Sequence, residues 1–253
     1  MRIMRRSLLV IGIVLPLLAA CHHGRVAPVP DPVAELAKAR AEFRGGDYEG
    51  ALTTFRRLTY ELGPTEAGMA DVRFHLAECY FQTGDRVEAA HEFRQVADQY
   101  PTSDFAPLAL LRAGDANVRL WKDPELDPSY GETALATYQE LVGRYPGTSA
   151  AARAQLHAQQ LKEWFSQKTY KNGMFYFKRR AFDSGIIYFK DVIANYPGTE
   201  RVPDALMRLV ESYHIIGYTD ELKETCAHLR RFFPQTPGLD KSCPADSSAA
   251  TPS

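Results

Sequence analysis

Several residue types are scarce in this chain, and each shortage excludes a class of protein. Only four cysteines occur in 253 residues, too few for a fold held together by disulfides. The 30 basic and 31 acidic residues nearly balance, whereas a dedicated nucleic-acid binder carries a basic excess. One apolar run near the N-terminus is shorter than the roughly 20 residues of a membrane-spanning helix. We therefore expect a globular chain with no nucleic-acid partner.

Catalytic motifs are also missing. The sequence has no Ser, His and Asp arrangement, glycine-rich phosphate loop or dinucleotide-binding fingerprint. His75 and Cys79 lie four residues apart and could share a metal ion, but a structural zinc site needs four ligands and no second pair is suitably spaced. We interpret Cys79 as a packed core residue. We expect no enzymatic activity, no cofactor and no small-molecule substrate.

The N-terminus has the pattern of a secretory signal. Arg2, Arg5 and Arg6 precede an apolar run over residues 8–18, and Leu-Ala-Ala-Cys ends it at Cys21. This ending resembles the lipobox of bacterial lipoproteins, in which the Cys thiol receives a diacylglyceryl group. The alternative is an ordinary signal peptide followed by a chance cysteine. We predict that residues 1–20 are a cleaved signal peptide and that Cys21 carries lipid, including palmitate.

The segment after Cys21 predicts a tether and a destination. Residues 21–32 are polar and contain three prolines, a composition typical of an extended spacer. Several acyl chains would anchor the protein stably to a membrane. Residue 22 is His rather than the Asp that in enteric bacteria favours retention in the inner membrane. By this resemblance we expect the outer membrane.

Five segments of the remaining chain repeat one pattern. Each ends at a hydrophobic residue close before a proline, and apolar or small residues stand 4, 7 and 11 positions earlier, which together form one face of a helix. The end positions are Leu62, Tyr100, Tyr145, Tyr196 and Phe233. A second helical stretch precedes most segments, often with a glycine between the two. This is the tetratricopeptide (TPR) pattern, and it predicts an all-α, right-handed solenoid of about five helix pairs over residues 33–236.

Two insertions and a tail interrupt the period. Residues 122–128 contain two prolines and predict a loop, whereas residues 150–178 predict a lengthened helix. Residues 237–253 are rich in Ser, Ala and Pro and predict a disordered tail. Cys226 and Cys243 are the natural partners for a disulfide in an oxidising compartment, but the sequence leaves this pairing open.

A lipobox followed by five such repeats resembles the BamD-type lipoproteins of the β-barrel assembly machinery. The resemblance covers residues 33–236 and is most specific over residues 175–197, although Arg180 stands where the family usually has glycine. It implies a scaffold anchored on the periplasmic face of the outer membrane. The implied partners are the periplasmic domains of the barrel insertase, other lipoproteins of the machinery and unfolded outer-membrane proteins.

Two candidate surfaces follow from the repeat register. The first helices of a TPR solenoid line its concave face, where exposed aromatic residues bind partner segments. We expect this groove to contain Phe43, Phe74, Phe81, Tyr170, Met174 and Phe177, unless these side chains pack against neighbouring helices. The second surface is a basic turn in repeat four, formed by Lys178, Arg179 and Arg180. It is either an ordinary solvated turn or a contact for an acidic patch.

One competing function belongs to a different class. Periplasmic TPR adaptors of the YbgF/CpoB type act in cell-envelope constriction and peptidoglycan synthesis. These adaptors usually have a coiled coil before the repeats and no lipobox, so the assembly scaffold is the preferred interpretation.

Overall fold

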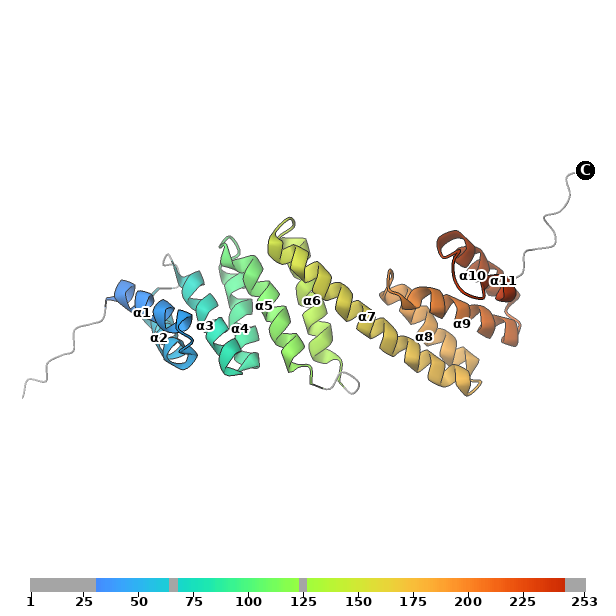
Figure 1. Cartoon of the computed structure of the whole chain (residues 1–253), viewed down its shortest axis with the longest axis horizontal. Coiled ribbons are helices and arrows are strands. Elements are labelled where there is room, and N and C mark those ends of the chain that lie inside the picture. Colours follow the sequence, from blue (N-terminus) through green and yellow to red (C-terminus); the bar gives the residue numbers. More distant parts are fainter. Residues whose placement is uncertain (1–30, 64–67, 123–126, 244–253) are drawn as a thin grey trace, which may run out of the picture. The chain divides into compact units, whose positions relative to one another are not determined.

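Ten helices and one short helical turn make up the regular structure of the described chain. The computed structural model describes residues 31–63, 68–122 and 127–243, and within these ranges it contains no strand. The helices are α1 (Pro32–Arg44), α2 (Tyr48–Glu61), α3 (Met69–Thr83), α4 (Arg86–Gln99), α5 (Phe105–Leu120), α6 (Ser129–Arg144), α7 (Ser149–Lys178), α8 (Phe182–Asn195), α9 (Arg201–Ile216), α10 (Thr219–Phe232) and α11 (Leu239–Ser242) (Figure 1). The predicted all-α class is confirmed.

The ten long helices form five successive pairs. Each helix packs against the next along the chain, from α1 with α2 through to α9 with α10. The first helices of neighbouring pairs also touch, at α1–α3, α3–α5, α5–α7 and α7–α9. Second helices of neighbouring pairs make no comparable contact within the described ranges. The first helices therefore share one side of the solenoid, which we call the first-helix face.

The predicted repeat register is confirmed residue by residue. Each of the five end positions is the C-cap of a second helix. The residue seven positions before the cap is buried in every repeat: Phe55, Phe93, Tyr138, Phe189 and Cys226. The residue four positions before the cap is fully buried: Leu58, Val96, Leu141, Val192 and Leu229. The core consists of four apolar clusters, each joining one repeat to the next. No pair therefore buries its apolar side chains alone.

Four of the five turns between paired helices contain a residue in the left-handed conformation within the described chain. Gly46, Gly84 and Gly217 have φ values of +82°, +103° and +81°. Glycine adopts this conformation without a Cβ clash. In repeat four the same role falls to Arg180, whose φ is +61°. Arg180 is the only non-glycine residue with positive φ in the described chain.

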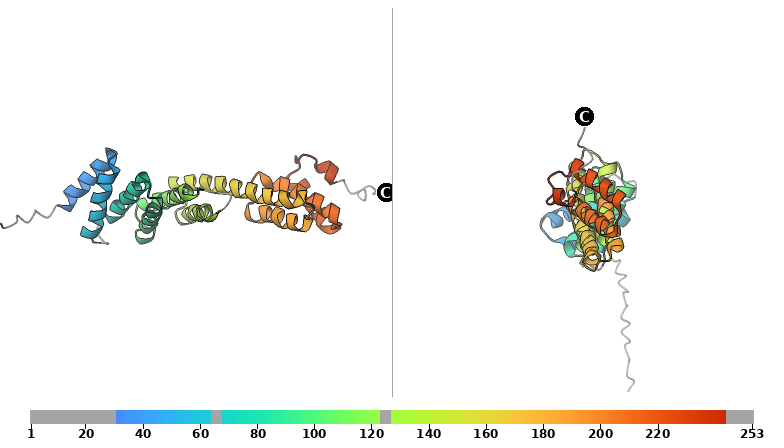
Figure 2. Two further views of the ribbon diagram at one scale, coloured as in Figure 1. Left: turned by 90° about the horizontal axis from the view of Figure 1, so that it is seen from below. Right: turned by 90° about the vertical axis from the view of Figure 1, so that its right-hand side faces the viewer.

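Helix α7 joins the two halves of the solenoid. It spans 30 residues, as predicted for the second insertion. Its N-terminal part lies beside α6, and its C-terminal part lies beside α8 (Figures 1 and 2). Trp121, at the start of the loop between α5 and α6, packs against Trp164 and Phe165 of α7, with ring centroids 4.5 and 5.3 Å apart. These rings anchor the described ends of that loop to the long helix.

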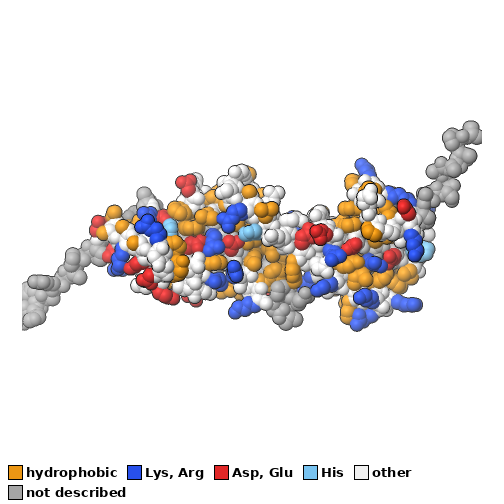
Figure 3. All heavy atoms as spheres, viewed as in Figure 1, with side chains coloured by type: hydrophobic (Ala, Val, Ile, Leu, Met, Phe, Trp, Pro, Cys, Tyr) orange, Lys and Arg blue, Asp and Glu red, His pale blue; other side chains and the backbone are white. Residues whose placement is uncertain are grey.

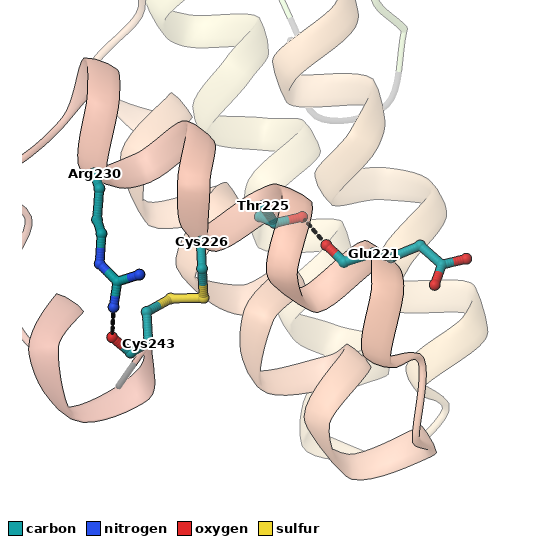
Figure 4. Close-up of a disulfide and its surroundings, with 5 residues drawn as sticks. All are labelled: Glu221, Thr225, Cys226, Arg230 and Cys243. Carbon is teal, nitrogen blue, oxygen red and sulfur yellow. Dashed lines mark hydrogen bonds between the residues drawn. A yellow bond between two sulfur atoms is a disulfide. The ribbon is translucent and has the colours of Figure 1, made fainter. Parts of the chain in front are cut away.

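The C-terminal segment differs from the sequence prediction. Residues 239–242 form the helical turn α11, although a disordered tail was expected from residue 237. Cys226 and Cys243 form a disulfide, which answers the question that the sequence left open (Figure 4). This cross-link holds the turn to α10. Residues 244–253 lie outside the described chain.

Candidate protein-binding surfaces

A ladder of polar contacts connects the first helices across the solenoid. Arg40 of α1 pairs with Asp71 of α3. Arg112 of α5 forms two hydrogen bonds with Glu78 of α3, at 2.5 and 2.8 Å. The ladder continues through His157 and Asp115, between α7 and α5, and through Arg201 and Gln167, between α9 and α7. The first-helix face is therefore polar and largely charge-compensated.

The sequence analysis missed this ladder, although a signal was present. Glu78 and Arg112 are 34 residues apart, and so are Gln167 and Arg201. This separation is one TPR period, which places both members of a pair at matching positions of successive first helices. Complementary polar residues one period apart would have indicated these contacts.

Two of the predicted groove aromatics are core residues. Phe74 is 6% exposed and lies 5.5 Å from Phe93 and 5.0 Å from Phe105, measured between ring centroids. Phe81 is 9% exposed, with the guanidinium carbons of Arg86 and Arg112 at 4.3 and 4.0 Å from its ring centre. For Phe74 and Phe81 the alternative in which these rings pack against neighbouring helices therefore holds, because α4 and α5 cover most of each ring.

The other four groove residues are half-buried. Phe43 packs edge-on against Tyr48 and His75. Tyr170, Met174 and Phe177 cover the core cluster between repeats four and five. The hydroxyl of Tyr170 accepts a 3.4 Å hydrogen bond from Arg208 of α9. These side chains support neighbouring helices, and any contact with a partner would use only their exposed edges.

A recess opens on the first-helix face where α3, α5 and α7 meet. Its volume is about 530 Å³, and Phe81, Val118 and Leu161 supply apolar walls. Polar groups share the lining, including Asp115, Arg119, His157 and Gln160. Arg112 and Asp115 are already paired with each other, whereas Arg119 has no ion-pair partner within the described residues. The recess thus combines apolar walls with hydrogen-bonding groups.

His75 and Cys79 each make contacts that a structural role explains. Cys79 is fully buried, and this burial raises the pKa of its thiol to about 12. Nδ1 of His75 lies 2.6 Å from the Asp71 carboxylate. Burial opposes the charged form of His75, but the contacts with Asp71 outweigh it and raise the pKa of the imidazole. No group of three or more candidate ligand side chains is assembled anywhere in the described chain.

The predicted basic turn is exposed. Lys178 ends α7, and Arg179 and Arg180 form the turn before α8. The guanidinium carbon of Arg179 lies 3.5 Å from the ring centre of Phe175, and its Nη1 donates a 3.1 Å hydrogen bond to the Phe175 carbonyl. Arg179 is therefore held in place, whereas Arg180 makes no side-chain hydrogen bond or ion pair within the described chain.

An apolar patch that the sequence analysis did not single out adjoins this turn. Phe175 is 50% exposed and Ile187 of α8 is 68% exposed, and the rings of Tyr176 and Tyr188 stack at 5.4 Å. In Figure 3, basic side chains gather at the α7–α8 turn next to hydrophobic ones. We call these four side chains and the three cations the repeat-four surface. The sequence analysis missed its apolar part because helical periodicity shows which residues share a face of a helix but not whether another helix covers that face.

The predicted lipid site cannot be placed on this structure. Cys21 lies outside the described residues, as do the signal peptide and most of the tether. Helix α1 already begins at Pro32, the last residue assigned to the tether. None of the described helices has the length and apolar character needed to cross a membrane.

The family of the chain follows from a match that covers most of the repeats. The model of the YfiO family, described as "Outer membrane lipoprotein", matches residues 32–229. The chain belongs to this family. The matched range contains α1 to α9 and most of α10, and it ends before α11 and the second cysteine of the disulfide. The family match thus includes the first-helix face and the repeat-four surface but excludes the C-terminal turn.

Several curated members of this family are similar to the chain. The outer membrane protein assembly factor BamD of Caulobacter vibrioides is 30% identical over 155 residues, which cover 61% of this chain and 51% of that protein. BamD of Neisseria meningitidis serogroup A is 24% identical over 215 residues, with coverages of 80% and 79%. BamD of Rickettsia prowazekii is 30% identical over 117 residues, with coverages of 46% and 47%. The chain therefore spans about half the length of two of these relatives.

Several solved structures are also similar in part. A thermophilic TPR protein from Thermus thermophilus has a TM-score of 0.41 and 20% identity, and the match covers 83% of this chain and 96% of that one. The type IV pilus biogenesis factor PilW has a TM-score of 0.39 and 15% identity, with coverages of 83% and 97%.

Proposed function

We propose that this protein is a lipid-anchored scaffold on the periplasmic face of the outer membrane, where it takes part in the assembly of outer-membrane proteins. Membership of the outer membrane lipoprotein family carries this proposal. The similarity to BamD proteins named as assembly factors supports it. A row of helix pairs with extended side surfaces suits a protein whose work is binding rather than catalysis.

The contact with the insertase is assigned to the repeat-four surface. Three adjacent cations border exposed aromatic and aliphatic side chains there, a combination that suits an interface with an apolar centre and a charged rim. The protein carries 27 basic and 31 acidic residues from Cys21 onward, so this local positive cluster differs in sign from the chain as a whole. The complementary surface on the periplasmic domains of the insertase is therefore acidic around an apolar centre.

The binding site for unfolded outer-membrane proteins is assigned to the first-helix face. Their strands alternate apolar and polar side chains. The recess beside Phe81 offers both apolar walls and polar groups such as Arg119 and Gln160, so an extended strand can place alternate side chains against each. The charge-compensated ladder around the recess limits non-specific attraction. Other lipoproteins of the machinery are further expected partners, without an assigned surface.

The anchor is assigned to Cys21. The Cys21 thiol would carry a thioether-linked diacylglyceryl group, and cleavage before Cys21 would free its amine for an N-acyl chain. The prolines that follow would hold the repeats away from the membrane. Changing Cys21 to Ser should abolish palmitate labelling and release the protein from outer-membrane fractions. Persistent labelling of the Cys21→Ser variant would exclude this residue as the lipid site.

Charge reversal on the repeat-four surface tests the insertase contact. The double variant Arg179→Glu and Arg180→Glu should bind the purified periplasmic domains more weakly and associate more slowly, with a larger effect at low salt. The matched control reverses Lys38 and Arg44, two exposed cations of α1, and produces the same change in net charge. The assignment would be contradicted if the variant, the control and the wild type had equal affinities and association rates at both salt concentrations. The repeat-four surface would then not contact the insertase.

A further inference from the structure

The short helix α11 occupies a particular position in the repeat architecture. Every first helix after α1 packs against both helices of the preceding pair: α3 on α1 and α2, α5 on α3 and α4, and so on to α9 on α7 and α8. Helix α11 packs in the same way on α9 and α10. It therefore takes the place that the first helix of a sixth repeat would fill.

Few contacts attach α11 to the rest of the protein. It is four residues long, whereas an isolated helix needs on the order of 12–15 residues even for marginal stability in water. Among its residues only Leu239 is buried, at 5% exposure. The disulfide to Cys226 and a hydrogen bond from Arg230 to the carbonyl of Cys243 complete the attachment (Figure 4). The disulfide is the one covalent bond among these contacts.

The surface beneath α11 is apolar. Leu239 and Cys243 belong to the same core cluster as Met207, Val210 and Cys226 of α9 and α10. Gly238 starts the turn at a φ of +79°, and a Cβ at this position would lie 3.9 Å from the terminal carbon of Met207. If α11 left, the apolar surface of α9 and α10 that it covers would be exposed, and we call this surface the helix seat. Arg230 would then be free to bind the carbonyl end of another helix.

We propose that residues 239–243 are a removable cap on repeat five, locked by the Cys226–Cys243 disulfide and released by a dithiol reductant. In the release step the reductant's two thiols become a disulfide, and the S–S bond accepts two electrons and two protons to give two cysteine thiols. The terminal repeat is closed in the oxidised protein and presents an apolar helix seat in the reduced one. This inference is independent of the assigned insertase and substrate contacts.

Thiol reactivity measures the release directly, and the chain contains its own control. In the full-length Cys243→Ser variant, Cys226 carries a free thiol that becomes accessible only when the cap leaves. Its alkylation by a maleimide should be at least tenfold faster than that of Cys79, which is fully buried between repeats. Hydrogen exchange should rise at residues 239–243 and stay unchanged from α1 to α8.

Two results would overturn the proposal. Cys226 alkylation as slow as that of Cys79 would mean that the cap stays seated without the disulfide. Fast exchange throughout α9 and α10 would mean that the disulfide holds repeat five together rather than locking a cap. A second variant, Leu239→Ala with both cysteines present, separates packing from the covalent lock. Its residues 239–243 should remain protected while oxidised and lose protection on reduction with dithiothreitol.

Discussion

Arg180 holds a backbone conformation that should make its replacement by glycine stabilising. A residue with a Cβ in the left-handed region costs about 1–2 kcal/mol relative to its right-handed conformation. Glycine removes this strain but gives the unfolded chain more freedom, which costs about 0.4–1 kcal/mol. Because the Arg180 side chain is exposed and makes no hydrogen bond or ion pair within the described chain, little else is lost. Arg180→Gly should increase the free energy of unfolding by about 0.5–1 kcal/mol.

The neighbouring arginine supplies the matched control. Arg179 has a φ of −90°, so glycine relieves no strain there, and the substitution removes the stack on Phe175. Arg179→Gly should lower the free energy of unfolding by about 1 kcal/mol. In both thermal and urea unfolding, the midpoints of the two variants should therefore shift in opposite directions from the wild type. Tm should rise by about 1–4 °C for Arg180→Gly. A loss of stability in Arg180→Gly would refute the strain argument.

The same variant separates stability from function. If Arg180 contributes to the insertase contact, Arg180→Gly should bind more weakly although it is more stable. Retention of a strained residue at this turn would then be explained by binding. If the variant is more stable and its affinity for the insertase domains is unchanged, Arg180 does not contribute to that contact.

Three further predictions concern packing and pH. Ala89→Trp should overpack repeat two and cost roughly 1–3 kcal/mol, because Ala89 is fully buried; unchanged urea unfolding would contradict the register. Gly173→Ala should lower Tm because its Cβ would lie 2.6 Å from a core ring, whereas Gly143→Ala, with open space around it, should raise Tm through helix propensity. The raised pKa of His75 means that its pairing with Asp71 stabilises the fold below the ordinary histidine pKa of about 6.5 and is lost as pH rises through the folded-state value. Urea unfolding at pH 6 and pH 8 should show this loss in the wild type, and His75→Gln should remove it.

The repeat register was predictable from sequence because its signals are local. Helix caps, the small residue at position 51, 89 or 134 and the buried aromatic four residues later all lie within one helix. The pattern repeats five times, so weak signals at single positions reinforce one another. The long helix α7 was predicted for a similar reason, since Leu156, Leu161 and Phe165 continue the helical spacing of apolar residues through the insertion.

The features that the sequence did not reveal depend on contacts between repeats. Phe74 and Phe81 occupy positions where a regular TPR exposes its first helix, but α4 and α5 bring Phe93 and Arg112 onto them. Helix α11 was not expected although its cross-link joins the cysteine pair that the sequence offered, because the composition of residues 237–253 alone indicates a disordered tail. Ile187 is likewise exposed because it lies on the side of α8 that no described helix covers. Local periodicity carries no information about such neighbours.

The effect of depletion on barrel assembly tests the central claim most directly. The chain should be depleted in its native bacterium, and the folded fraction of a β-barrel protein in outer-membrane fractions should be measured by heat-modifiable gel mobility. An assembly scaffold predicts that this fraction falls early, before septation and peptidoglycan synthesis change, and that the wild-type chain restores it. Normal barrel folding together with an early constriction defect would contradict the account and favour an envelope-constriction adaptor.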